Sequence, residues 1–254
     1  MAQKENITAF VLRAVNYADR DVIVTLLSRD RGVISAIAKN ARSSKRFSGG
    51  IQPFRKVDAL IEPRSNKDIH LFLEMQVLAH YPKLEADYDK ITIGSYGTEL
   101  LRELSKGEPS SELLFDLLES FYQQLDAIGD DSLANETILH HFELLLLKRF
   151  GALPSLHECH RCGKPHEQME KLQCKRTGEG LLCESCRRPG EAVGVIEAGT
   201  LATLQYYLEP RGGFPEALGQ AESRQQARRV VNNSFKIILQ KDLKSRSMLE
   251  TVLV

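Results

Sequence analysis

The sequence contains no tryptophan, and aromatic residues make up only 7% of its 254 residues. No apolar run approaches the roughly 18 residues that a membrane-spanning helix needs. The first residues, MAQKENITAF, also lack the apolar segment of a secretory signal peptide. Because the sequence has neither a membrane-spanning run nor a signal peptide, we expect a cytoplasmic protein with no membrane contact.

The common catalytic and nucleotide-binding motifs are absent as well. The sequence has no G-x-x-x-x-G-K-[ST] phosphate loop, no G-x-G-x-x-G after a strand, no H-E-x-x-H and no G-x-S-x-G. His140 and His141 lie within an expected helix, and neither has an evident acid or nucleophile partner in the sequence. We therefore do not expect an enzyme.

Acidic residues are missing from one segment although the formal net charge of the chain is zero. Residues 1–80 hold 13 cations and 8 acids, residues 81–147 hold 4 and 14, and residues 148–254 hold 17 and 12. Between Asp30 and Asp58 there is no acid at all, while seven residues are Lys or Arg. Basic segments of this kind are where a polyanion binds, and a solvated charged face is the simpler alternative.

Five short β-patterns in the first 80 residues predict a small barrel. They cover residues 7–15, 22–27, 33–38, 57–61 and 69–78 and are rich in β-branched residues. A five-stranded OB-fold barrel is one solution, and an SH3-like barrel is its main competitor. Apolar residues at helical spacing then predict helices near 88–106, 111–128, 132–149, 197–208 and 216–246.

The acid-free segment falls between the third and fourth expected strands, so we place it in a long loop at the mouth of the barrel. Cations that follow phosphates, together with aromatic rings that stack on bases, are what single-stranded nucleic acid requires. A second basic run lies near the C-terminal end. The sequence thus predicts nucleic-acid contacts from Lys39, Arg42, Lys45, Arg46, Phe47, Arg55, Lys56, Arg228 and Arg229. The alternatives are a solvated loop whose Phe side chains pack inward and, for the second run, a solvated helix face.

All five cysteines lie between Cys159 and Cys186. Four of them form the pattern C-x2-C-x20-C-x2-C, which is typical of a tetrahedral four-sulfur zinc site. We therefore predict zinc bound by Cys159, Cys162, Cys183 and Cys186, in a structural role, because such a site has no open coordination position. The fifth, Cys174, is expected to pack beside the site.

Several stretches resemble the RecO family, the recombination mediators of bacterial DNA repair. They are YADRDVIVTLLS at residues 17–28, AIAKNAR at residues 36–42, QPF at residues 52–54 and GALPSL at residues 151–156, before the first cysteine pair. The usual glycine before Ala-Arg is Asn40 in this chain, and asparagine tolerates left-handed backbone.

The resemblance implies an α+β protein in which an OB-fold barrel is followed by an all-helical domain that carries a zinc module. The expected parts are an OB-fold DNA-binding domain (1–80), a central helical domain (81–154), a four-cysteine zinc module (155–190) and C-terminal helices packing on the central helical domain (191–254). The implied activity is binding of single- and double-stranded DNA, annealing of complementary strands, and loading of RecA onto strands coated by single-strand binding protein.

The same resemblance implies two protein partners, RecR and the acidic C-terminal tail of single-strand binding protein. The tail's dock is expected in the central helices, on Phe142, Leu145, Leu146 and Arg149. The alternative for the three apolar residues is that they are core. An alternative function for the whole chain is an RNA-binding factor associated with ribosomes, built from an OB fold and a zinc ribbon.

Overall fold

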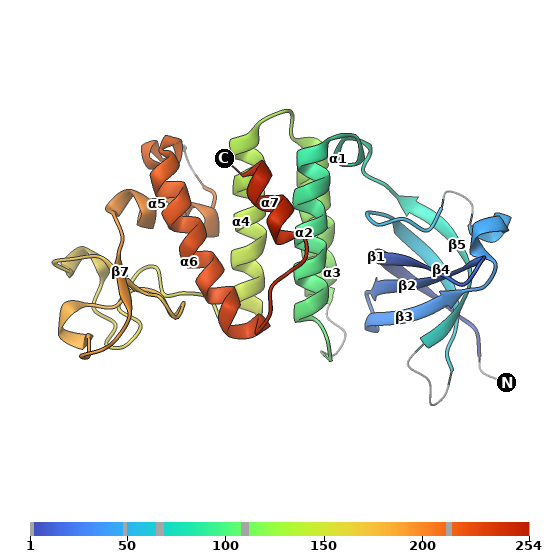
Figure 1. Cartoon of the computed structure of the whole chain (residues 1–254), viewed down its shortest axis with the longest axis horizontal. Coiled ribbons are helices and arrows are strands. Elements are labelled where there is room, and N and C mark those ends of the chain that lie inside the picture. The colour runs from blue at the N-terminus through green and yellow to red at the C-terminus, as the bar shows by residue number, and fades with distance from the viewer. Residues whose placement is uncertain (1–2, 48–49, 65–68, 108–111, 212–214, 254) are drawn as a thin grey trace. The chain divides into compact units, whose positions relative to one another are not determined.

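The computed structural model describes residues 3–47, 50–64, 69–107, 112–211 and 215–253. The chain divides into two compact units, residues 1–129 and residues 130–254. Figure 1 shows the barrel strands in the N-terminal part of the first unit, followed by helices and, in the second unit, a small segment that includes the short strand β7. Within the described residues, no helix combines the length and the apolar character needed to cross a membrane.

The first unit begins with a closed five-stranded barrel (Figure 1). Its strands are β1 (Glu5–Tyr17), β2 (Asp21–Ser28), β3 (Gly32–Ala38), β4 (Lys56–Glu62) and β5 (Ile69–Ala79). The strand order is β1-β2-β3-β5-β4, with β3 and β5 parallel and the other pairs antiparallel. This order is that of an OB barrel rather than an SH3-like barrel, so the predicted fold class is confirmed.

Apolar and polar residues alternate along the strands. Because successive side chains point to opposite faces of the sheet, the apolar ones fill the inside of the barrel. In β4 the inward residues Val57, Ala59 and Ile61 are completely buried, and Lys56, Asp58 and Leu60 between them are partly exposed. A bulge between Val11 and Arg13 shifts this alternation in β1.

Three helices pack beside the barrel in the same unit: α1 (Pro82–Ala86), α2 (Tyr88–Leu104) and α3 (Glu112–Ala127). Phe10 of β1 lies at their contact with the barrel, with its ring centroid 4.7 Å from that of Phe115 and 5.6 Å from that of Tyr122. Phe54 adds an edge-on contact with Tyr122 at 5.4 Å. These buried aromatic contacts account for the compactness of the first unit.

The second unit is built on α4 (Ser132–Arg149), which packs against α5 (Ala198–Leu208) and α6 (Ala221–Leu239) (Figure 1). Asp131 caps α4 by accepting hydrogen bonds from the backbone N–H groups of Leu133 and Ala134. The single helix expected over 216–246 is wrong. A 3-10 turn, η5 (Glu216–Gly219), precedes α6, and Gln240 ends α6 in the left-handed conformation at φ +52° before a separate α7 (Arg246–Val252).

A small module lies between α4 and α5 in the sequence. It holds the short strands β6 (Gln173–Lys175) and β7 (Val193–Val195) and the 3-10 turns η3 (His166–Gln168) and η4 (Glu184–Cys186). The module touches α6 at Gly178, whose carbonyl accepts a hydrogen bond from the Ser234 hydroxyl at 3.0 Å. A Cβ atom at Gly178 would lie 2.7 Å from Ser234 Cα, so glycine is what permits this close approach.

Candidate metal centre and nucleic-acid interface

Four cysteine sulfurs converge in the small module. The Sγ atoms of Cys159, Cys162, Cys183 and Cys186 all lie within 4.8 Å of one another. Those of Cys162 and Cys183 are 3.7 Å apart. Four sulfurs bonded at about 2.3 Å to one tetrahedral Zn²⁺ would be about 3.8 Å from each other. The cluster therefore has the donors and the spacing to hold a metal ion.

The backbone around Cys159 favours its thiolate form. Cys159 and Cys183 are buried, with exposed fractions of 1% and 0%, and the Cys183 N–H donates a hydrogen bond to Cys159 Sγ at 3.4 Å. Burial raises the pKa of Cys159, but the backbone N–H groups of Cys183, Arg161 and Cys162 outweigh it and bring the pKa down to about 6. Thiolate is the form of cysteine that ligates metals.

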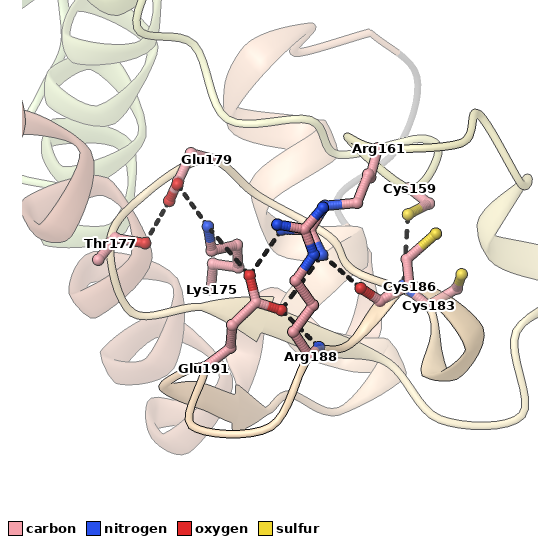
Figure 2. A network of polar contacts seen from close by, with 9 residues as sticks. All are labelled: Cys159, Arg161, Lys175, Thr177, Glu179, Cys183, Cys186, Arg188 and Glu191. Atoms are coloured by element: carbon pink, nitrogen blue, oxygen red, sulfur yellow. Dashed lines mark hydrogen bonds and ion pairs between the residues drawn. The ribbon is translucent and has the colours of Figure 1, made fainter.

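Arg161 connects the two cysteine pairs (Figure 2). Its guanidinium donates to the carbonyl oxygen of Cys186 and to Glu191 Oε1 at 2.6 Å. Glu191 also accepts from the Arg188 backbone N–H at 2.7 Å. The hydrogen bonds from Arg161 and then from Arg188 lower the pKa of Glu191 to about 2. A charged hydrogen-bond network thus holds the pair 159/162 against the pair 183/186.

Cys174 lies apart from the four converging sulfurs. It sits on β6 with an exposed fraction of 4%, and burial raises the pKa of its thiol to about 12. Cys174 thus lies on the β6–β7 ribbon, as expected, with its side chain buried. A neutral buried thiol is unreactive, so this residue has no character of a nucleophile.

Three cations of the acid-free segment stand free on the barrel. Arg42, Lys45 and Arg46 are exposed on the 3-10 turns η1 (Ala41–Ser43) and η2 (Lys45–Phe47). Within the described part of the chain, none of the three has a carboxylate partner. Arg42 donates to the carbonyl oxygen of Asp19 at 3.1 Å, and Arg46 Nε donates to the Ser44 hydroxyl at 3.1 Å.

Arg42 and Lys45 border an open cavity of about 530 Å³ that also reaches Asn16 and Gln52. None of the residues that line it is acidic. Lys45 and Arg46 border a second hollow in which Asp58 and Glu74 take part. The acid-free cavity is therefore the surface of this unit that suits a phosphate backbone.

The other four cations of the segment are neutralised by acids from elsewhere in the unit. Three of them, Lys39, Arg55 and Lys56, were predicted to contact nucleic acid, and each lies in an ion pair within the unit. Arg55 and Lys56 point instead to the acids of α1 and α3. The pairs are Arg31 with Glu5 at 2.7 Å, Lys39 with Asp21, Arg55 with Glu85 at 2.7 Å, and Lys56 with Glu119 at 2.6 Å.

Phe47 is also placed differently from the sequence expectation. Its side chain is 4% exposed and meets Phe72 edge-on, with ring centroids 5.2 Å apart, inside the barrel core. A ring buried in this way has no face to offer to a base, so Phe47 fixes the η2 turn instead. The exposed aromatic near the basic turns is Tyr17, at 53%.

Tyr17 and Arg20 are candidate contacts that the sequence reasoning missed. Both are exposed beside the turn between β1 and β2, and the Arg20 carbonyl accepts a hydrogen bond from the Arg42 N–H at 3.2 Å. The sequence feature that could have identified them is the stretch YADRD at residues 17–21, a polar turn with one aromatic residue between two apolar strands. The link to Arg42 spans more than 20 residues of sequence and becomes visible only in the fold.

The basic run on α6 separates into a buried side and an exposed side. Arg224 and Arg228 lie 3.2 Å and 3.3 Å from the carboxylate of Glu136, which is buried. Arg228, which was predicted to contact DNA, is therefore paired with an acid inside the unit. Arg229 is exposed, and in the described part of the chain its side chain has no acidic partner.

The residues expected to bind an acidic tail do not form a single exposed slot. Phe142 and Leu146 of α4 are buried, at 2% and 0%, as the core alternative predicted. Leu145 and Arg149 are partly exposed, and the Arg149 guanidinium lies 5.6 Å from the ring centroid of Phe150. Only the second pair can contact a partner without a change in the core.

An OB barrel with a free basic surface, in one chain with a helical unit that carries a four-sulfur cluster, defines an OB-fold protein with a four-cysteine module that could hold a metal ion. The family described as Recombination protein O N terminal matches residues 1–81, and Recombination protein O C terminal matches residues 85–247. The chain belongs to the RecO family.

Two relatives support this membership over nearly the whole chain. A protein from Anaeromyxobacter dehalogenans (strain 2CP-C), named DNA repair protein RecO, is 33% identical over 250 residues, which cover 97% of this chain and 96% of the relative. A protein of the same name from Syntrophus aciditrophicus (strain SB) is 32% identical over 248 residues, covering 96% and 94% of the two chains.

Proposed function

We propose that this protein is a DNA-binding recombination mediator of DNA repair. It binds single- and double-stranded DNA, anneals complementary strands, and helps load RecA onto strands coated by single-strand binding protein. Its protein partners are RecR and the C-terminal tail of single-strand binding protein, and it acts in the cytoplasm. The observation that carries the DNA-binding part is the group of three free cations, Arg42, Lys45 and Arg46, on an OB barrel of a RecO family chain.

Annealing on such a surface requires no bond making and no active site. Two phosphate backbones repel each other, and exposed guanidinium and ammonium groups screen that repulsion and raise the rate of encounter. Base pairing between the strands then supplies the free energy. Ser43 and Ser44 add hydroxyl donors to the same turns, and phosphate contacts of this kind position a strand without reading its sequence.

In this proposal each part of the chain has a separate role. Residues 1–80 hold DNA, residues 81–154 offer the partner contacts, residues 155–190 are held together by zinc, and residues 191–254 pack on the central helices. Zinc at Cys159, Cys162, Cys183 and Cys186 would be structural. The cluster of buried side chains around the sulfurs is small, with Cys159, Leu182 and Cys183 at its centre, and two of these three are expected ligands. Metal binding would therefore supply free energy that the module needs to fold.

Salt dependence of single-strand binding tests the DNA-binding part. Three phosphate contacts predict a slope of log affinity against log salt near −2, at about −0.7 per contact. The double change Arg42→Ala and Lys45→Ala should shallow the slope by about 1.4 and slow annealing of every sequence alike. Fluorescence anisotropy with a labelled strand at several salt concentrations measures the slope.

The matched control is the double change Arg31→Ala and Lys39→Ala. It removes the same formal charge from exposed positions, but both side chains are already paired with acids, so the slope should stay as in the parent protein. Equal slopes for all three proteins would contradict the assignment to the free cations. Tighter binding of a matched RNA strand than of DNA would favour the RNA-binding alternative.

A further inference from the structure

A cavity of about 400 Å³ lies in the second unit, between the β6–β7 ribbon of the cysteine module and helix α6. Arg176 follows β6, and Arg229, Gln226 and Asn233 come from α6 at helical spacing. Both guanidinium groups belong to exposed residues, and no described carboxylate pairs with either of them. None of the residues lining the cavity is acidic.

Two acids of the module are already paired with cations other than Arg176 and Arg229 (Figure 2). Glu179 binds Lys175 Nζ at 2.6 Å, and Glu191 binds Arg161 at 2.6 Å. Among the described residues, Glu179 and Glu191 therefore neutralise Lys175 and Arg161 rather than Arg176 or Arg229. An anionic ligand would meet two guanidinium forks, the geometry that suits phosphate oxygens.

The amide groups of the cavity also offer donors. Gln226 Oε1 accepts a hydrogen bond from the Thr200 hydroxyl at 2.9 Å, which fixes the amide so that its NH₂ group remains to donate. Among the amide and guanidinium side chains that line the cavity, the acceptors are the two amide oxygens of Gln226 and Asn233, and the N–H donors of two guanidinium and two amide groups outnumber them. A phosphodiester backbone presents acceptors only, whereas a peptide presents as many N–H donors as carbonyl acceptors. The donor-rich lining favours nucleic acid over an acidic peptide.

The donor stripe continues along α6 beyond the cavity. Lys236 is exposed three residues after Asn233, so Gln226 to Lys236 spans about 15 Å at 1.5 Å per residue. Val195 of β7, 69% exposed, adds an apolar surface on which a base or sugar can rest. The cavity and the stripe together are long enough for more than one phosphate, at about 3.4 Å per phosphate along a strand.

We infer that the cavity between the β6–β7 ribbon and α6 is a second binding site for a single nucleic-acid strand, held by Arg176, Arg229, Gln226 and Lys236 without sequence preference. This inference rests on the proposed function, because annealing brings two strands together and two sites on one chain would hold one strand each. The first strand lies on the free cations of the barrel and the second lies in this cavity. In this inference the role of the cysteine module is to position Arg176 across the cavity from α6.

Counting the strands bound at saturation tests the inference. The full-length, zinc-loaded protein is titrated at low salt with a labelled oligothymidine of about eight nucleotides, close to the footprint of one OB fold. The parent protein should bind two strands. The double change Arg176→Ala and Arg229→Ala should leave one, and so should Asn233→Asp, which places a carboxylate in the cavity.

The matched control is Lys148→Ala with Arg211→Ala, which removes two exposed cations of the same unit that do not line the cavity and should still bind two strands. A parent protein that binds one strand, lost on Arg42→Ala with Lys45→Ala but not on the cavity changes, would overturn the second site and leave the proposed function standing. Failure of the parent protein to bind any strand would overturn both. Retention of two strands, with loss of an aspartate-rich peptide from the Arg176/Arg229 variant, would assign the cavity to a protein partner and overturn the inference.

Discussion

A buried cluster of charged groups makes the stability of the second unit depend on pH. His140 is 3% exposed. Its Nδ1 atom lies 2.6 Å from Glu143 Oε2, and its Nε2 atom lies 3.6 Å from Glu136 Oε1. Burial disfavours the charged imidazolium, but the interactions with the carboxylates of Glu136 and then Glu143 outweigh it and raise the pKa of His140 to about 9. His140 is therefore protonated in the folded protein at neutral pH.

Groups from two other helices complete the surroundings of this histidine. Tyr207 of α5 stacks on it at 4.7 Å between ring centroids and donates its hydroxyl to Glu136 at 3.1 Å. The guanidinium groups of Arg224 and Arg228 on α6 also face Glu136. Burial raises the pKa of Glu136, but its partners, with His140 first, bring the net pKa below the ordinary value. Glu136 therefore stays ionised in the range where His140 titrates.

The size of the effect follows from linkage. A histidine whose pKa rises from 6.5 in the unfolded chain to about 9 in the folded one stabilises the fold fully below pH 6.5. It loses that contribution as the pH rises through 9. At about 1.4 kcal/mol for each unit of pKa, the full contribution is about 3 kcal/mol, and about 2 kcal/mol of it should disappear between pH 7 and pH 9.

Urea unfolding of the zinc-loaded protein at pH 7, 8 and 9 measures this loss. The chain has no tryptophan, so far-ultraviolet circular dichroism is the suitable readout. His140→Gln should be less stable at pH 7 and should lose the pH dependence of the free energy of unfolding. His141→Gln is the control, because His141 is only partly buried and bonds to the Tyr207 carbonyl oxygen. An unchanged pH dependence in His140→Gln would refute the reasoning.

Three further predictions concern the cysteine module and the partner surface. Elemental analysis should find about one zinc per chain in the parent protein and in Cys174→Ser, but less than about 0.3 in Cys183→Ser; loss of zinc from Cys174→Ser would contradict the four-ligand assignment. Gly180→Ala places a Cβ atom 2.2 Å from the Ser155 backbone nitrogen, so thermal unfolding should show at least about 3 kcal/mol of destabilisation. Gly190→Ala, also at positive φ but in open space, should cost about 1 kcal/mol, and equal costs would disprove the steric argument. Arg149→Glu should weaken anisotropy-detected binding of an aspartate-rich peptide ending in Phe by at least about 1 kcal/mol while naked DNA binds as before; equal peptide binding would place the dock elsewhere.

The elements of this protein follow closely from local sequence. The five strands were predicted from short-range alternation, and α4 from its helical period between Asp131 and Gly151. Both patterns depend on residues that are two to four positions apart. The long helix expected over 216–246 failed for the same reason, because an apolar period does not reveal the left-handed residue Gln240 that ends α6.

The four-sulfur cluster was also determined by sequence alone. Each Cys-x-x-Cys pair is a local turn that brings two sulfurs to one side, and a single closure of the intervening chain joins the two turns. The resemblance to the RecO family was also visible in the sequence, because it lies in contiguous stretches such as residues 17–28 and 36–42.

Only the tertiary structure decided which charges and rings are free. Arg55 and Lys56 stand beside each other in an acid-free segment, yet their partners Glu85 and Glu119 lie 30 and 63 residues away in the sequence. Arg228 meets Glu136 on another helix, while its neighbour Arg229 faces solvent. Phe47 was expected to stack on a base and instead fills the barrel core. Burial and ion pairing depend on elements that meet only after the chain folds. A count of charges along the sequence therefore does not distinguish Arg42 and Lys45, which have no acidic partner among the described residues, from the cations that pair with acids in the fold.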